Sequence, residues 1–141
     1  MNNKEKILHF MKKEELMVIS TLNKEGKPQS AVVAYTETRD LEIIFGTFNN
    51  TRKYANLKNN ASVSLVIGWN IDEKITIQLE GDAQELFGQE LEKCRKLHIA
   101  KNPKREKWCY EVQERFFKIK PVWIRYSDLS KEPEEIFEIT K

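Results

Sequence analysis

Residues 43–57 read IIFGTFNNTRKYANL, and within this stretch the pattern of a β-strand changes to that of a helix. The first six residues are mostly apolar or β-branched, as is typical of a strand. Residues 49–51 (Asn-Asn-Thr) can each accept a hydrogen bond from the free N–H groups of a first helical turn. We therefore predict a strand over residues 41–48, followed by a helix over residues 52–59.

Two adjacent cations, Arg52 and Lys53, begin this predicted helix. The first turn of a helix has unpaired N–H groups and the positive end of the helix dipole, and both attract anions. The Thr51 hydroxyl can add a hydrogen bond, Arg52 can bind phosphate oxygens in a fork, and Lys53 adds a point charge. Two interpretations remain open on these residues alone: a phosphate site, or a capped surface helix whose two cations are solvated.

The rest of the chain is a series of short strands separated by turn residues. Gly26 can supply a positive φ in a polar turn, and Gly81 indicates a bulge or a bend within a long strand. Strands are expected over residues 16–22, 29–38, 41–48, 61–69, 74–86, 115–128 and 136–139. Helices are expected over residues 3–15, 52–59 and 88–100, with a further short helix capped by Asn102 and starting at Pro103. The helix over 88–100 is expected to have Leu91, Cys94 and Leu97 on its apolar face.

This order of elements predicts a mainly β fold with flanking short helices. Tight turns join the early strands, so these strands are expected to pair antiparallel. About six to seven strands with few helices favour a barrel, because closure removes exposed strand edges. No repeat and no linker rich in Pro, Gly or Ser divides the chain, so residues 1–141 are expected to form one domain.

The charge balance argues against a general nucleic-acid-binding protein. The chain has 24 Lys and Arg residues against 22 Asp and Glu residues, which gives a net charge of +2. Nucleic-acid-binding domains usually carry a concentrated basic face, so no nucleic-acid partner is expected. An aromatic and basic run over residues 116–120 (FFKIK) keeps a nucleic-acid-binding barrel among the alternatives.

Segments for export or membrane insertion are not expected. Residues 1–10 are polar and mixed in charge, and no apolar run approaches the roughly 20 residues that span a bilayer. We therefore expect a cytoplasmic protein in which Cys94 and Cys109 are reduced thiols. His9 and His98 are expected to be surface or helix-end histidines without other ligands at metal-binding spacing, so no metal site is predicted.

In their order and spacing, these segments resemble the pyridoxamine 5'-phosphate oxidase-like family, the flavin-binding split barrels. The resemblance extends over residues 16–126. The segments that carry it are Gly26-Lys27-Pro28, Ala31-Val32-Val33, residues 41–47 (LEIIFGT), Thr51-Arg52-Lys53 with Asn56-Leu57, residues 61–66 (ASVSLV), Gln78-Leu79-Glu80-Gly81 and residues 119–126 (IKPVWIRY).

The resemblance implies a split β-barrel that forms a homodimer, with flavin mononucleotide (FMN) in two grooves at the interface. It implies that Arg52 and Lys53 bind the flavin phosphate and that Gln78 reaches the cofactor, plausibly from the other subunit. Periodicity alone places Gln78 on the polar face of its strand, where it is either solvated or part of a site. Trp123 is preferred to Trp108 as the tryptophan near the flavin. The cofactor-binding residues so implied are Ala31, Val32, Val33, Phe45, Thr47, Thr51, Arg52, Lys53, Gln78 and Trp123.

The function that the resemblance implies is that of an FMN-dependent oxidoreductase acting on an unidentified small molecule. The alternative is a flavin carrier or sensor without turnover. A flavin carries the redox chemistry itself, so no catalytic residue is nominated. Residues 132–141 (EPEEIFEITK) are acidic, whereas pyridoxamine phosphate oxidases have a basic, histidine-containing segment there. An acidic segment is a poor site for an anionic substrate, so vitamin B6 phosphate is not expected as the substrate.

Overall fold

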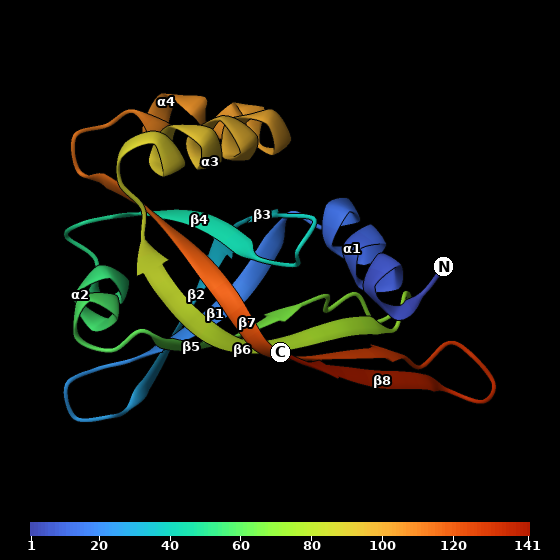
Figure 1. The fold of residues 1–141 in the computed structure, drawn as a ribbon. Helices are drawn as coiled ribbons and strands as arrows, with labels where there is room; N and C mark the ends of the chain where they lie inside the picture. The colour runs from blue at the N-terminus through green and yellow to red at the C-terminus, as the bar shows by residue number, and fades with distance from the viewer.

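The computed structural model describes all residues, 1–141, and its fold is mainly β with four short α-helices (Figure 1). The elements in chain order are α1 (Asn3–Lys13), β1 (Leu16–Leu22), β2 (Pro28–Ala34), β3 (Thr36–Glu37), β4 (Ile43–Phe48), α2 (Arg52–Asn59), β5 (Ser62–Ile67), β6 (Ile75–Glu85), α3 (Gly88–Lys101), the 3₁₀ helix η1 (Pro103–Arg105), α4 (Glu106–Cys109), β7 (Glu114–Asp128) and β8 (Glu135–Thr140). Each expected strand and helix is present, and the strand expected over residues 29–38 is divided into β2 and β3.

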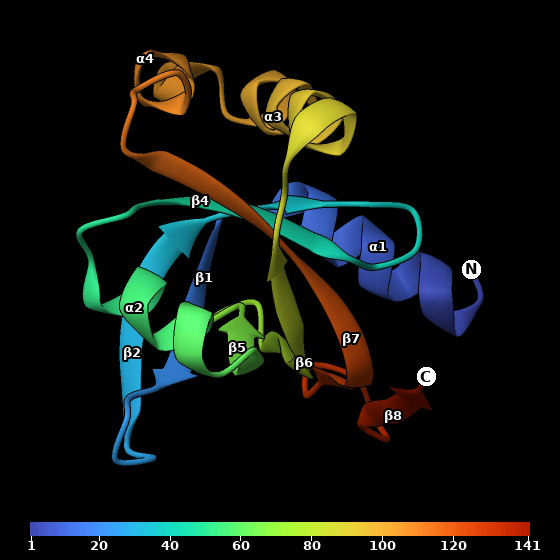
Figure 2. The same cartoon turned by 60° about the vertical axis from the view of Figure 1, so that its left-hand side comes forward.

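All eight strands belong to one antiparallel sheet, in the order β2-β1-β5-β6-β7-β4-β3, with β8 paired to β7. β2 and β3 end this order on opposite sides, yet only Tyr35 separates them in the chain. The sheet is therefore curled on itself (Figure 2). Because β2 and β4 share no ladder of paired residues, the barrel is split between them. The predicted split β-barrel class is confirmed.

Two of the predicted strands have different limits in the structure. The strand expected over residues 29–38 is interrupted at Tyr35, whose buried hydroxyl donates a hydrogen bond to the Met11 carbonyl oxygen at 2.7 Å. The strand expected from residue 41 starts at Ile43, because Leu41 has a φ of +66° and belongs to the preceding turn. At the first position the Tyr35 N–H donates to the Glu15 carbonyl oxygen at 3.2 Å, outside the strand ladders, and at the second a turn precedes β4. The apolar pattern reveals neither feature.

Other local predictions are confirmed or corrected by the backbone. Gly26 has a φ of +77°, and the register of β6 against β7 shifts between Glu80 and Gly81, as a bulge requires. Asn102 does not cap a helix with its side chain; the side-chain amide instead donates to the carbonyl oxygens of Tyr35 and His98. The segment that follows begins as the 3₁₀ helix η1.

The core has two parts, one on each face of β4. Ile43 and Phe45 point into the barrel, where the Phe45 ring stacks on Phe117 at 5.5 Å. Ile44 points to the other face and packs under α3 and α4 with Leu86, Cys94, Cys109 and Phe116. Burial on both faces explains why β4 is apolar without alternation.

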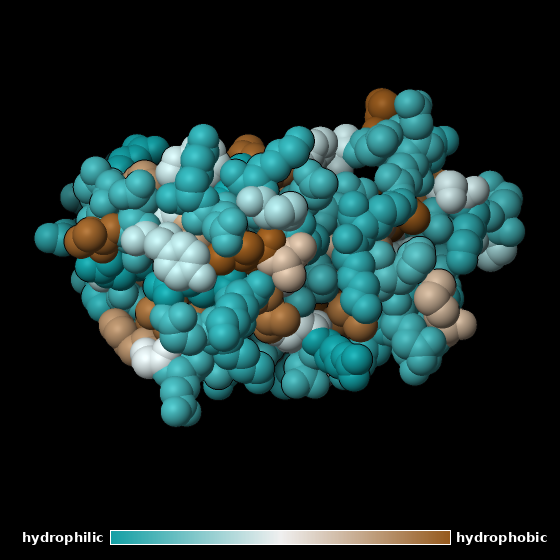
Figure 3. Space-filling model, turned by 90° about the horizontal axis from the view of Figure 1, so that it is seen from above, coloured by the Kyte–Doolittle hydropathy of each residue, from teal (hydrophilic) through white to brown (hydrophobic).

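The helices α3 and α4 form an outer layer over β4. Figure 3 shows this side of the molecule from above, where hydrophilic side chains cover most of the surface. The exposed charged residues there are Glu92, Lys93, Lys96, Lys104, Arg105, Glu106 and Lys107. None of the helices combines the length and apolar character needed to cross a membrane.

Candidate functional site

The start of α2 is built around the hydroxyl of Thr51, the N-cap residue. Thr51 Oγ1 accepts a hydrogen bond from the Tyr54 N–H at 3.2 Å and donates to the Phe48 carbonyl oxygen at 2.9 Å. Thr47 Oγ1, at the end of β4, lies 3.0 Å from Thr51 Oγ1. Since the single Thr51 proton goes to Phe48, Thr47 is the donor in this third bond. Of the three cap candidates in residues 49–51, the structure uses Thr51.

A cavity of about 180 Å³, here called the helix cavity, opens beside the first turn of α2. Its lining includes Arg52 and Lys53, and neither cation forms an ion pair or side-chain hydrogen bond within the chain. The buried Asn56 amide donates to Thr21 Oγ1 at 2.9 Å and to Gln29 Oε1 at 3.0 Å. The full lining is Ile19, Thr21, Gln29, Ser30, Ala31, Thr51, Arg52, Lys53 and Asn56.

A second cavity of about 260 Å³, here called the split cavity, occupies the gap between β2 and β4. The segment from α3 to α4 covers it, and the first residue of β7 closes one side. Its lining residues are Val33, Ala34, Gly46, Thr47, Phe48, His98, Arg105, Trp108, Cys109 and Glu114.

The two cavities are neighbours along the same strands. Ala31 lines the helix cavity and Val33 lines the split cavity, two residues further along β2. The bond between Thr47 and Thr51 joins their linings on the other side. We call the pair the two-part groove. It has cations and a helix N-terminus at one end, and a mixed apolar and polar space at the other, so it suits a ligand with an anionic end and a ring.

Glu114 and Lys53 are ionisable residues on opposite parts of the two-part groove. Burial raises the pKa of Glu114 to about 7, although the charges of Lys53, Arg105 and Arg95 oppose this shift. Burial also lowers the pKa of Lys53, and the Glu114 charge opposes that shift. At neutral pH the Glu114 carboxyl is therefore divided between its neutral and charged forms.

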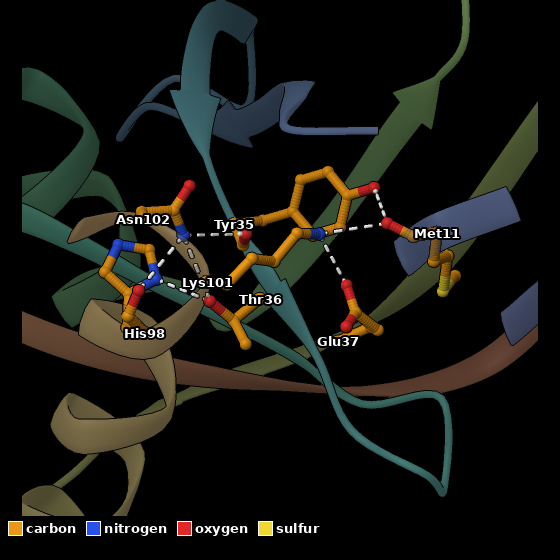
Figure 4. A network of polar contacts seen from close by, with 7 residues as sticks. All are labelled: Met11, Tyr35, Thr36, Glu37, His98, Lys101 and Asn102. Carbon is orange, nitrogen blue, oxygen red and sulfur yellow. Dashed lines mark hydrogen bonds and ion pairs between the residues drawn. The ribbon is translucent and has the colours of Figure 1, made fainter. Parts of the chain in front are cut away.

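His98 lies in the last turn of α3, as expected of a helix-end histidine, but it is buried, with 3% of its surface exposed, so it is not a surface histidine. Its Nδ1 lies 2.8 Å from Thr36 Oγ1 (Figure 4). Burial, helped by the charges of Arg105 and Lys101, lowers the pKa of His98 to about 4. The ring is therefore neutral at pH 7. Since Nε2 has no partner in the chain and no buried polar atom is left unbonded, this nitrogen is accessible from the split cavity.

The network around His98 extends to the end of α1. Lys101 Nζ donates to the Met11 carbonyl oxygen at 2.9 Å, forms an ion pair with Glu37, and lies 4.0 Å from the centre of the Tyr35 ring. Figure 4 shows Lys101 among these partners from β3 and α1. These contacts hold the cover of the split cavity to the barrel.

The structure brings together six of the ten predicted site residues. Ala31, Thr51, Arg52 and Lys53 line the helix cavity, and Val33 and Thr47 line the split cavity. The other four residues lie elsewhere in the single chain.

Two of these four, Val32 and Phe45, are sequence neighbours of residues that line the groove, but they do not line it themselves. The side chain of Val32 is 61% exposed and lines neither cavity. Phe45 is fully buried in the barrel core. Gln78 and Trp123 line a separate hollow of about 230 Å³ over β1, β5, β6 and β7. Trp108, and not Trp123, lines the groove of the same chain.

Sequence reasoning missed His98, Arg105, Cys109 and Glu114 as lining residues. A signal existed for His98, since it follows Cys94 by four residues and so shares its helix face. The structure buries His98 on that face and leaves Leu97 42% exposed, contrary to the predicted apolar face. Arg105 and Glu114 are brought to the cavity by the path of the chain between α3 and β7, which no local pattern indicates.

Known proteins share this fold and much of this sequence pattern. The sequence model of the pyridoxamine 5'-phosphate oxidase family matches residues 4–128, and the chain belongs to that family. A pyridoxine/pyridoxamine 5'-phosphate oxidase of Ehrlichia ruminantium (strain Welgevonden) is 32% identical over 82 residues, which is 58% of this chain and 42% of that protein. One of Blochmanniella floridana is 31% identical over 77 residues, which is 55% of this chain and 36% of that protein. The match thus spans about two fifths of the length of these relatives.

Solved structures agree on the fold. A heme binding protein from Mycobacterium smegmatis superposes with a TM-score of 0.83 at 15% identity, over 99% of this chain and 59% of that one. The General Stress Protein 26 from Bacillus anthracis str. Sterne has a TM-score of 0.76 at 23% identity, over 99% of this chain and 100% of that one. At such identities the likeness shows the split-barrel fold alone.

Proposed function

We propose that this protein binds FMN in the two-part groove and acts as an FMN-dependent oxidoreductase on a small molecule. The observation that carries the proposal is the pair of cations, Arg52 and Lys53, without ion-pair partners at the capped start of α2. Family membership supports the same cofactor. A phosphate monoester fits there because helix N–H groups, a guanidinium and an ammonium all attract it.

The kinds of residue along the groove match the parts of an FMN molecule. Arg52, Lys53 and the first turn of α2 would hold the phosphate, and Asn56 keeps its neighbours Thr21 and Gln29 in place. Val33 and Ala34 offer an apolar wall for a flat ring, while Thr47 and the open His98 nitrogen offer hydrogen bonds. A bound flavin would supply two-electron redox chemistry, and the cover from α3 to α4 would restrict access of water and substrate to it.

We further propose a homodimer in which the second subunit completes the site. Gln78 and Trp123 lie on a sheet face that also exposes apolar side chains, among them Val66 (38%) and Val122 (45%). A second copy on this face would cover these side chains and could present Gln78 to the partner's flavin. Size-exclusion chromatography with light scattering would test it: a monomer at micromolar concentration with FMN bound would contradict the dimer.

Vitamin B6 phosphate is not part of the proposal. β8, which contains Glu135 and Glu138, pairs with β7 and contributes no residue to either cavity. β8 therefore supplies no basic residue to the groove that could hold a second phosphate.

An absorbance titration with FMN tests the proposal. Wild type should show the shifted spectrum of a bound flavin, and Arg52→Glu should weaken binding at least tenfold, because it places a carboxylate where the phosphate would bind. Arg39→Glu makes the same charge change at an exposed residue outside both cavities and should bind FMN like wild type. Absence of FMN binding by wild type would overturn the proposal.

A second experiment separates the oxidoreductase from a non-catalytic flavin carrier or sensor. The FMN complex is mixed with NADH or NADPH without oxygen, and reduction is followed by loss of flavin absorbance. Reduction followed by reoxidation with an added acceptor supports the enzyme. A flavin that binds tightly but is never reduced supports the carrier.

A further inference from the structure

The Glu114 side chain has no partner within the chain. Its carboxylate forms neither a hydrogen bond nor an ion pair, although it lines the split cavity. Glu114 is paired with Phe48 across β4 and β7, and its carboxylate lies over Gly46 so closely that a Cβ atom at Gly46 would collide with it. A glycine at position 46 thus leaves room for the carboxylate beside the groove.

Three cations from three elements act on this carboxyl through their charge. Lys53 comes from α2, Arg95 from α3 and Arg105 from η1. α4 adds the buried thiol of Cys109, whose pKa is raised by burial, and β4 adds no ionisable group. His98 also lines the cavity and is neutral at pH 7. Arg95 is already bonded to Glu92 and to the Cys109 carbonyl oxygen, whereas Lys53 and Arg105 form no ion pair.

We expect the charge state of Glu114 to depend on what binds at the helix cavity. Burial favours the neutral carboxyl, and the positive potential of Lys53 favours the carboxylate. A phosphate bound to Lys53 and Arg52 cancels that potential and adds negative charge nearby. Both effects favour protonation, and a neutral carboxyl has an O–H group that can donate a hydrogen bond.

We propose that Glu114 is a ligand-binding residue that takes up one proton from solvent when an anionic group binds at Arg52 and Lys53, and then donates a hydrogen bond into the split cavity. The ligand class follows from this: a phosphate monoester whose other end is an uncharged ring bearing a hydrogen-bond acceptor. A second anionic group at the ring end would be repelled whenever Glu114 is charged. The inference rests on the proposed function in taking FMN as the ligand.

The test is FMN affinity and proton uptake, measured by titration calorimetry at pH 6, 7 and 8 in buffers of different ionisation enthalpy. Wild type is compared with Glu114→Gln, which retains a donor but cannot titrate. The ratio of wild-type to Glu114→Gln affinity should fall about three- to tenfold from pH 6 to pH 8, because one unit of pKa change corresponds to tenfold. Protons exchanged by the FMN phosphate contribute equally in both proteins, so they cancel in the ratio of the two affinities.

Two further variants separate the parts of the inference. In a Lys53→Arg background the cation cannot lose its proton, so a difference in uptake that persists there belongs to Glu114. Glu114→Leu has no donor and should bind FMN about two- to tenfold more weakly than Glu114→Gln at pH 6, as the loss of one hydrogen bond predicts. Equal affinity of these two variants would overturn the hydrogen bond.

The outcomes also separate this inference from the proposed function. If FMN binds and the affinity ratio does not change with pH, Glu114 has no such role and the FMN site stands. If wild type binds no FMN, the proposed function is wrong, and inorganic phosphate tests Glu114 alone. NMR of ¹³C-labelled glutamate carboxyls should then show the Glu114 pKa rising with phosphate, and an unchanged pKa would overturn the inference.

Discussion

Thr47 Oγ1 lies 3.0 Å from Thr51 Oγ1, and this bond joins the end of β4 to the cap of α2. The contact also lies where the helix cavity meets the split cavity. A single hydroxyl pair thus fixes the position of the first turn of α2 relative to the rest of the groove.

Replacing Thr51 by Val should destabilise the protein and weaken FMN binding together. The change removes the N-cap acceptor and leaves the Thr47 hydroxyl without its acceptor, at a cost of about 1–2 kcal/mol in the free energy of unfolding. Urea unfolding and FMN titration measure the two effects. Thr51→Ser keeps the hydroxyl and should retain most of both, and equal losses in the two variants would show that the hydroxyl is not the cause.

The free energy of unfolding should decrease as the pH falls from about 6.5 to about 4, because His98 is buried in its neutral form. Its pKa is lowered to about 4 in the folded state, so the unfolded chain binds a proton in this range and the folded chain does not. The contribution is complete above pH 6.5 and is lost progressively below it, by up to a few kcal/mol.

The measurement is urea unfolding of wild type and His98→Gln at pH 7, 5.5 and 4.5. Glutamine can bond to Thr36 but does not titrate in this range. The stability difference between the two proteins should shift in favour of His98→Gln as the pH falls. A difference that stays constant with pH would show that His98 is not held neutral in the folded protein.

The ion pair of Lys101 and Glu37 should contribute strongly to stability, because each of its two charges is buried and needs the other. Their side chains are only 14% and 9% exposed. Lys101→Met leaves the Glu37 carboxylate buried without its cation, which should cost about 3–5 kcal/mol in the free energy of unfolding. The double variant Lys101→Met, Glu37→Gln should recover much of this loss. Additive effects of the two single changes, measured by urea unfolding, would contradict a direct coupling.

Gly81→Ala should destabilise the barrel without touching the groove. A Cβ at Gly81 would lie within contact of the Lys120 backbone carbonyl group, which cannot move without disturbing β7. We expect a loss of about 1–3 kcal/mol, as for other overpacked sites. Gly26→Ala is the comparison: the added Cβ meets no atom within 4 Å, so its cost comes only from the positive φ. Equal losses would show that crowding at Gly81 is not the cause.

Much of this fold could be predicted from local pattern. Alternating apolar residues located β5 and β6, the predicted helix over residues 52–59 coincides with α2, and side-chain chemistry limited the cap to residues 49–51. Strands, helices and caps can be predicted in this way because the hydrogen bonds of a turn or helix involve residues that are close in sequence. For the same reason, the residue types alone were enough to make Arg52 and Lys53 candidates for a phosphate site.

The sequence by itself thus determined most of the strands and helices and the candidate phosphate-binding residues Arg52 and Lys53. Only the tertiary structure decided the other end, where Arg105, Trp108 and Glu114 meet His98 beside β4. It also decided that Phe45 belongs to the core and that Gln78 lies on a different face of the barrel from the groove of its own chain. The physical reason is that a cavity between strands is formed by segments far apart in the chain, whose meeting depends on how the sheet curls and where it splits.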